Sequence, residues 1–366
     1  MNSSRASTGG GFRSSYEHQR RTAPTRSADQ RRSSTRCGIG RRPGAFAISL
    51  FLFKRFATFV ATLLVASAVV FAVLDVLPGN VAEVMLGESA TPEAVQALGE
   101  KLGLNAPPLA RYGRWLGGLA RGDLGTSVSY DTPVAELIVE RLVVTAPLAL
   151  LAMAITTVLA LAFGIYAASR HNRLGDVGVM AASQFGIALP NFWFAILLIL
   201  VFSVKLQWFA AGGFPGWSAE DGGGFGPALQ ALVLPAVALA VVQAAILARI
   251  TRSAVLDVMR EDFVRTARAK GLSHRAVLWR HVLRNAFVPV LTVMGLQFAN
   301  LLTGTIVVEQ VFSLPGIGRL IFQAIANRDL VVVRNVVMLL AAAVILINFV
   351  VDVLYAVIDP RLKGRG

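Results

Sequence analysis

Residues 249–289 read RITRSAVLDVMREDFVRTARAKGLSHRAVLWRHVLRNAFVP, and long apolar segments stand on both sides of them. The stretch carries nine Lys and Arg residues against three Asp and Glu residues. Because loops rich in Lys and Arg stay on the cytoplasmic side of a membrane, we predict that a cytoplasmic loop here joins two membrane helices.

Two short helices are predicted inside this loop. Arg260 to Lys270 has the pattern of a helix, and Gly271 is a residue that tolerates the left-handed backbone at a helix end. Ser273 can cap a second helix that begins at His274. We therefore expect a helix–glycine–helix elbow, a shape suited to docking a soluble partner.

The order of residues in the elbow resembles a known family. Arg265-Thr266-Ala267, followed by Gly271, resembles the EAA loop of ATP-binding-cassette (ABC) importer permeases. The segment from Phe263 through Arg284-Asn285-Ala286 to Pro289 is similar to the dipeptide/oligopeptide/nickel branch, in which Arg265 stands where the general motif has Glu. The resemblance implies that a cytoplasmic ATPase contacts a coupling helix made of Arg265, Thr266, Ala267, Arg268, Ala269, Lys270, Gly271 and Leu272. The charges alone would favour a solvated basic loop of any polytopic protein, and the ordered Gly, Asn and Pro positions favour the coupling helix instead.

The composition is that of a membrane protein. The chain is 55% hydrophobic with a mean hydropathy of +0.62, and only 15% of its residues are charged, against about 25% in soluble domains. The net charge of +14 comes from the amino-terminal tail and the predicted inner loops, so nucleic acid is not expected as a partner. The single Cys37 excludes a disulfide framework, an iron–sulfur cluster and a Cys-based zinc site, and the four His residues have no metal-ligand spacing.

The apolar segments predict an all-α polytopic fold with six membrane helices and both ends inside. The expected spans are residues 56–77, 143–168, 177–206, 229–250, 287–311 and 331–358. The expected regions are a disordered basic cytoplasmic tail (1–44), a first transmembrane helix (45–77), an extracytoplasmic segment (78–141), a five-helix core (142–358) containing the cytoplasmic coupling loop (251–285), and a second cytoplasmic tail (359–366).

The tail 1–44 is rich in Ser, Arg and Gly and cannot bury enough surface to fold. Its arginines could contact anionic lipids, or the segment could be an inert extension or a start codon set too far upstream. Arg41-Arg42 raises the question of a twin-arginine signal, but the apolar run that follows is longer than a signal core. We therefore expect an uncleaved first helix.

Residues 78–141 are predicted on the outer face because their acidic residues outnumber their basic ones. Thr91 and Pro92 should begin a short helix to Lys101, whereas Pro107-Pro108 and Gly117-Gly118 are typical of turns. Two further stretches resemble outer segments of the same family. They contain Gly122, Asp123, Leu124 and Gly125 in the first, and Glu309, Pro315 and Gly316 in the second.

Polar side chains within spans are costly toward lipid, so they are candidates for lining a translocation pathway. The candidates are Gln184, Asn191, Gln243, Gln297 and Asn300. Hydrogen bonding between helices is an equal alternative for these amides. Asp352 lies near the inner end of the last span, so we expect it to form a structural ion pair instead of acting in a proton relay. Pro190 and Pro235 mark kinks, either along the pathway or in ordinary packing.

No GxxxxGK[ST] loop and no Ser/His/Asp or HExxH arrangement occurs, so this chain is expected to bind no cofactor and to catalyse no reaction. The resemblance implies a plasma-membrane importer of a bacterium with a second permease, two ATPases that hydrolyse ATP with Mg²⁺, and an extracytoplasmic substrate-binding protein. Its cargo would be a dipeptide or oligopeptide, with nickel, haem or another small solute as alternatives. A stand-alone secondary transporter or channel, or a membrane-embedded enzyme, would need a repeat, a charged relay or a catalytic cluster that the sequence does not show.

Overall fold

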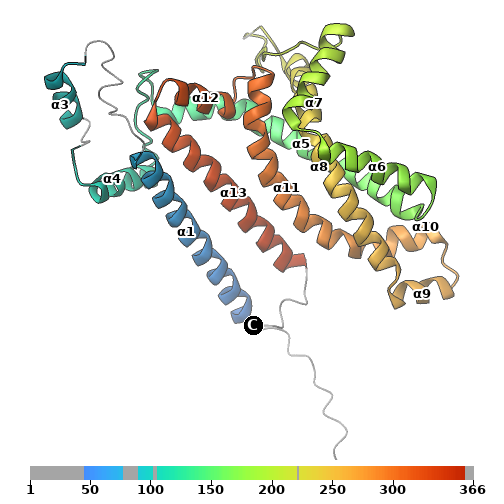
Figure 1. The fold of residues 1–366 in the computed structure, drawn as a ribbon. Coiled ribbons are helices and arrows are strands. Elements are labelled where there is room, and N and C mark those ends of the chain that lie inside the picture. The colour runs from blue at the N-terminus through green and yellow to red at the C-terminus, as the bar shows by residue number, and fades with distance from the viewer. Residues whose placement is uncertain (1–44, 77–89, 102–104, 221, 359–366) are drawn as a thin grey trace, which may run out of the picture. The chain divides into compact units, whose positions relative to one another are not determined.

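The computed structural model describes residues 45–76, 90–101, 105–220 and 222–358. Within these ranges the chain is helical, with no strand beyond an isolated bridge between Thr126 and Pro133 (Figure 1). The predicted tails 1–44 and 359–366 lie outside the described residues, as do residues 78–89 of the predicted extracytoplasmic segment. The helices are α1 (Ala45–Val76), α3 (Pro92–Lys101), α4 (Pro108–Arg121), α5 (Val134–Ser169), α6 (Leu174–Ala188), α7 (Asn191–Leu198), the π-helical η2 (Ile199–Lys205), α8 (Phe225–Met259), α9 (Asp262–Ala269), α10 (His274–Val277), the π-helical η3 (Leu278–Val282), α11 (Leu283–Val311), α12 (Ile317–Ala326) and α13 (Leu330–Ile358).

Five helices of the described chain are long and apolar enough to cross a membrane, and a bent pair makes a sixth candidate. The five are Phe53–Asp75, Val134–Ser169, Phe225–Met259, His274–Val311 and Leu330–Leu354. The prediction of an all-α polytopic membrane protein is therefore confirmed.

The third span differs from the prediction of one continuous helix over 177–206. It consists of Leu174–Ala188 and Asn191–Lys205, which meet at an angle of 102°. The break lies at Leu189, which is extended (φ −85°, ψ 126°), and at Pro190. A proline pushes the residue before it out of the helical region, so Pro190 breaks this span instead of only kinking it. Pro235, by contrast, lies inside the continuous helix α8.

Several helices extend beyond their predicted ends. Helix α5 begins at Val134, and α8 continues to Met259, because helical hydrogen bonding carries on past the apolar stretch into polar residues. Glycines 117 and 118 were wrong as turn signals, since both lie within α4. Pro107 does precede the helix in a non-helical conformation, and Pro108 is the first residue of α4. Helix α3 begins as predicted, and the Thr91 Oγ1 accepts a hydrogen bond from the Ala94 N–H at 3.3 Å.

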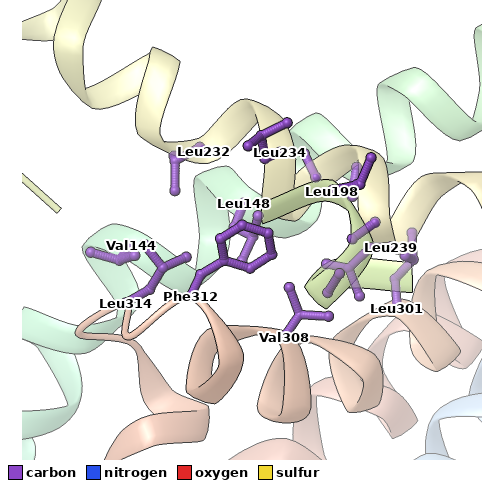
Figure 2. Packing of buried hydrophobic residues seen from close by; sticks show 14 residues of the cluster. Val144, Leu148, Leu198, Leu232, Leu234, Leu239, Leu301, Val308, Phe312 and Leu314 are labelled. Atoms are coloured by element: carbon purple, nitrogen blue, oxygen red, sulfur yellow. The ribbon is translucent and has the colours of Figure 1, made fainter. Parts of the chain in front are cut away.

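A buried apolar cluster holds α5, α7, α8 and α11 together. Figure 2 shows the ring of Phe312 pointing toward Leu148, with Val308 and Leu314 beside it and leucines of α8 above. Phe312 and Leu314 belong to the turn that follows α11, so this turn is part of the core. The cluster thereby fixes the end of α11 against α5 and α8.

The long helices α5 and α11 run antiparallel. A hydrogen bond joins Thr145, in the first part of α5, to Glu309 in the last turn of α11. The end of α5 lies beside a cavity that α10, which precedes α11, also lines. With 36 residues, α5 is roughly 54 Å long, more than the ~30 Å hydrocarbon core. The bundle therefore has two ends at opposite membrane faces, called below the elbow end (α9 and α10) and the motif end (residues 122–133 and 309–318).

The described ends of the chain lie together. Arg55 in α1 and Asp352 in α13 form an ion pair at 2.6 Å, so the first part of α1 meets the last part of α13. This confirms a structural ion pair for Asp352. At the other end of α1, Asp75 accepts a hydrogen bond from Arg111 of α4 at 2.9 Å. Helix α1 is thus antiparallel to α13.

Candidate functional site

The elbow, defined here as residues 262–277, is attached to the bundle by one face of α9. Val264 and Ala267 are buried in an apolar cluster with Val255 of α8 and Val277 of α10. The other residues of the predicted coupling helix, including Arg265, are exposed. The elbow therefore has an anchored apolar face and a basic face that no other part of the described chain covers.

The elbow is more compact than the predicted loop over 251–285. Its first helix spans Asp262–Ala269 rather than Arg260–Lys270, because Arg260 caps α8 and Glu261 is extended. Gly271 has φ +83°, as its predicted role requires. Its N–H donates to the Arg268 carbonyl at 2.9 Å, and the Leu272 N–H donates to the Ala267 carbonyl at 3.4 Å. This pair of bonds is the Schellman arrangement of a helix end.

The second half of the elbow continues directly into a membrane span. The Ser273 Oγ accepts a hydrogen bond from the Ala276 N–H at 3.3 Å, which confirms Ser273 as the cap. From His274, α10, η3 and α11 form one helical span to Val311, 38 residues long (Figure 1). No flexible loop separates the elbow from the fifth span. Sequence reasoning missed this continuity because the basic residues up to Arg284 suggested a loop.

At the motif end, Glu309 is fully buried and joins three elements. Its carboxylate accepts hydrogen bonds from the Thr145 Oγ1 and from the Gly318 N–H, both at 2.6 Å. The Thr145 Oγ1 in turn accepts a bond from the Ile317 N–H at 2.9 Å. These bonds satisfy free N–H groups in the first turn of α12. We call Thr145, Glu309, Gly316 and Gly318 the Glu309 cradle.

Gly316 and Gly318 of the cradle leave no room for a side chain. A Cβ on Gly316 would overlap the Glu309 carboxylate, and one on Gly318 would overlap the backbone of Ile306. The predicted outer segment thus begins inside a helix, since Glu309 is a residue of α11, while Pro315 and Gly316 form the turn before α12. Thr145, the other carboxylate partner, was not predicted, because no local pattern marks a threonine inside an apolar run.

The first of the two predicted outer stretches, Gly122 to Gly125, is bound to the start of α13. Gly122 ends α4 with φ +78°, and the Asp123 Oδ1 accepts a bond from the Gly125 N–H at 2.9 Å. The Leu124 carbonyl accepts a bond from the Asn335 Nδ2 at 2.7 Å. The stretch is therefore a fixed part of the bundle and not an isolated turn.

Asp329 was also missed. It is fully buried and accepts bonds from the Ser127 Oγ at 2.6 Å, the Ser129 N–H at 3.1 Å and the Val332 N–H at 3.1 Å. An aspartate directly before an apolar run is a helix-cap signal that could have indicated part of this role. The stretch that contains Gly122 to Gly125 and the stretch that contains Glu309 to Gly316 therefore pack together at the motif end, joined through Asp329 and α12.

Four of the five predicted pathway residues lie on α11 or close to it, and Gln184 does not. The Gln297 Nε2 donates to the Gln243 carbonyl at 3.3 Å, and the Asn300 Nδ2 donates to the Gln297 Oε1 at 3.4 Å. Asn191 lies close to the same helix, since a Cβ on Gly304 would be 3.6 Å from its Nδ2. Gln184 is exposed on α6. Hydrogen bonding between helices therefore accounts for the side chain of Gln297, whose partner on Gln243 is the backbone carbonyl. The Gln243 side chain is buried, and Asn300 is exposed on α11.

Within the described residues, no group of three or more His, Cys, Asp or Glu side chains is close enough together to hold a metal ion. The absence of cofactors in this chain stays an expectation.

These features define a polytopic helical membrane protein with the exposed elbow at one end and the buried Glu309 cradle at the other. Residues 160–364 match the family described as binding-protein-dependent transport system inner membrane component, and residues 48–149 match the amino-terminal model of the same system. The chain belongs to this family and is a permease subunit of an ABC importer. The predicted resemblance is thereby confirmed.

Relatives match almost over their whole length. A Brucella abortus (strain 2308) protein is 42% identical over 316 residues, 86% of this chain and 99% of its own. The dipeptide transport system permease protein DppB of Alkalihalophilus pseudofirmus is 38% identical over 329 residues, 86% of this chain and 99% of its own. The oligopeptide transport system permease protein AppB of Bacillus subtilis (strain 168) is 38% identical over 321 residues, 86% of this chain and 100% of its own.

The fold is similar to that of a solved structure. A chain of the inward-facing MetNI methionine ABC transporter superposes with a TM-score of 0.50 at 19% sequence identity, covering 61% of this chain and 96% of that one. At this identity the likeness shows the fold of an ABC transporter membrane chain.

Proposed function

We propose that this chain is one of two permease subunits of an ATP-driven peptide importer in a bacterial plasma membrane, with the elbow end and both chain ends in the cytoplasm. Its partners are a second permease, two ATPases that bind ATP and Mg²⁺, and an extracytoplasmic binding protein; the chain itself is non-catalytic. The observation that carries this proposal is the helical continuity from His274 to Val311, because it connects an exposed docking surface directly to a span.

The docking surface has the composition of a protein contact. Arg265 is 76% exposed at its side chain, and its pairing with Asp262 at 3.5 Å is too long and too solvated to hold it. Phe263, Leu272 and Trp279 are exposed nearby. Exposed apolar groups surrounded by polar ones mark interaction sites. An ATPase that moves the elbow would move α11 with it, since α9 also contacts α10 through buried side chains.

The exposed face of α11 supports a role in the pathway. Asn300, Thr303 and Gln310 lie on this face together with Leu296 and Val307. An amide facing lipid is costly, so we infer that water or the second permease covers this face in the assembled importer. Asn300 would then line the pathway, with Gln297 holding its side chain in place.

Peptide cargo is proposed from the names of the DppB and AppB relatives. The test is uptake by an importer reconstituted from this chain, a second permease, two ATPases and a binding protein. We expect ATP-dependent uptake of labelled dipeptide or oligopeptide, and competition by unlabelled peptide. Uptake of Ni²⁺ or haem without competition by peptide would replace the cargo and leave the permease role intact. Uptake that needs no ATPase would contradict the role itself.

Cysteine labelling tests the sidedness and the pathway. Replacing the single Cys37 by serine gives a cysteine-free background. We expect a membrane-impermeant maleimide to label Lys270→Cys from the cytoplasmic side and Ser129→Cys from the opposite side, since both residues are exposed at opposite ends of the bundle. We expect Asn300→Cys to be labelled in the assembled importer in at least one nucleotide state.

The matched control is Leu346→Cys, whose native side chain is 50% exposed on α13 and should face lipid. It should stay unlabelled in the bilayer and react only in detergent. Labelling of Lys270→Cys from outside would reverse the proposed topology. An Asn300→Cys chain as inert as the Leu346→Cys chain in every nucleotide state would remove Asn300 from the pathway.

A further inference from the structure

A basic cavity lies at the elbow end, between the α5–α6 turn and the elbow. It is open to the surface, has a volume of about 560 Å³ and is bordered by the end of α8 as well. Among the described residues no carboxylate lines it, and its basic lining residues are Arg170, His171, Arg173, Arg260, Arg268 and His274. None of the four arginines forms an ion pair with a carboxylate among the described residues. Such a cavity is electrostatically matched to an anion.

The cavity is held in shape by a buried ion pair outside its lining. Asp176 accepts hydrogen bonds from the Arg252 Nε at 2.5 Å and Nη2 at 2.6 Å, and from the Asn172 N–H at 3.0 Å. His171 approaches the same carboxylate at 3.4 Å. The α5–α6 turn is therefore fixed to α8, and the nearby acid is already occupied by Arg252. The backbone of the α5–α6 turn, which carries three of the basic residues, is therefore held in place before any ligand arrives.

An apolar groove lies further along the same three helices. It encloses about 300 Å³ between α5, α6 and α8. Phe163, Gly178, Ala182 and Gly186 are among its lining residues, and a Cβ on Gly178 would meet no atom within 4 Å. On α8, Ala248 lines the groove and Leu256 lines the basic cavity. Eight residues of helix correspond to ~12 Å, about the distance from a lipid phosphate into its acyl chains.

We propose that the basic cavity binds the phosphate group of an anionic phospholipid whose acyl chain lies in the apolar groove. Basic pockets between membrane helices on the cytoplasmic side are suited to anionic headgroups. Leu174, beside the cavity, is 91% exposed and is placed to contact acyl chains. The assignment to the inner leaflet rests on the proposed cytoplasmic position of the elbow. Because Arg268 belongs to α9, a bound lipid would hold the elbow against the α5–α6 turn.

The test is lipid titration of the purified full chain, followed by native mass spectrometry. We expect dioleoyl phosphatidylglycerol to bind tighter than dioleoyl phosphatidylcholine, which has the same chains and no net charge. The double variant Arg173→Gln/Arg268→Gln should weaken phosphatidylglycerol binding about thirtyfold. The control Arg275→Gln/Arg280→Gln removes the same charge from exposed residues that do not line the cavity. It should leave the affinity unchanged.

Two further arms separate a lipid from a free phosphate. Glycerol 3-phosphate and inorganic phosphate should bind much more weakly than the lipid. Gly178→Leu, which fills the groove, should weaken lipid binding, whereas Gly113→Leu on α4, where a Cβ also meets no atom within 4 Å, should not. Equal affinity for phosphatidylglycerol in both double variants, or phosphate binding as tight as lipid binding, would overturn the proposal. Release of the lipid when the ATPases are added would do so too, by assigning the cavity to the subunit interface. None of these outcomes depends on which cargo is transported.

Discussion

A valine in place of Gly271 should lower substrate uptake per ATP hydrolysed about tenfold, while the chain still inserts into the membrane. Gly271 has φ +83°, and an L-residue in that region costs ~1–2 kcal/mol, more if it is β-branched. The valine would pull the backbone out of this conformation and break the two bonds that end α9. Helix α9 would then lose its fixed angle to the α10–α11 span. Uptake of labelled peptide and release of phosphate are measured together in proteoliposomes.

The controls separate backbone conformation from size and from general damage. A Cβ on Gly271 meets no atom within 4 Å, so Gly271→Asn, which tolerates the left-handed region, should retain most coupled uptake. Gly122 has φ +78° and equally open surroundings at the motif end. Gly122→Val should therefore impose a similar strain and leave the uptake-to-hydrolysis ratio unchanged. Normal coupling in Gly271→Val would remove the elbow from force transmission.

Replacing Glu309 by alanine should destabilise the motif end more than any exposed substitution there. The change leaves the Gly318 N–H without its acceptor and the Thr145 hydroxyl without its own, and it opens a cavity where a buried side chain stood. Each unsatisfied buried group costs ~1–3 kcal/mol. We expect the apparent Tm of the purified chain in detergent to fall by roughly 5 °C or more.

Glu309→Gln keeps the size of the side chain and an oxygen that can accept from the Gly318 N–H. Its apparent Tm should therefore fall less than that of Glu309→Ala. Gln310→Ala changes the exposed neighbour and should leave the Tm in place. Gly316→Ala should reproduce much of the loss, because its Cβ would displace the Glu309 carboxylate. If Glu309→Ala melted like the native chain, the cradle would not be a stabilising element.

The sequence was sufficient for the class of fold and for the elbow. Mean hydropathy locates spans because lipid penalises polar backbone and side chains over a fixed thickness. Gly271 and Ser273 were assignable because left-handed conformations and helix caps depend on single residues. Helix lengths were less predictable. Helix α8 runs to Met259 through Arg249 and Arg252, since Arg252 is neutralised by Asp176, 76 positions away.

The contacts of the candidate site depended on residues distant in sequence. Glu309 meets Thr145 across 164 positions, and Ser127 meets Asp329 across 202. No local period signals such a pair. Among the proposed pathway residues, the hydrogen bond from the Gln297 side chain to the Gln243 backbone carbonyl could be found only once α8 was seen to pack on α11. The break at Pro190 could have been predicted from the sequence, because a residue directly before a proline, here Leu189, disfavours the helical conformation.

The span from His274 to Val311 also constrains how this protein can change over time. Each residue turns an α-helix by about 100°, so adding or deleting one would swing Asn300 away from its neighbours while the elbow stayed fixed. We therefore expect insertions and deletions to be tolerated better elsewhere in the chain, because residues 274–311 fix the rotation of Asn300 relative to the elbow.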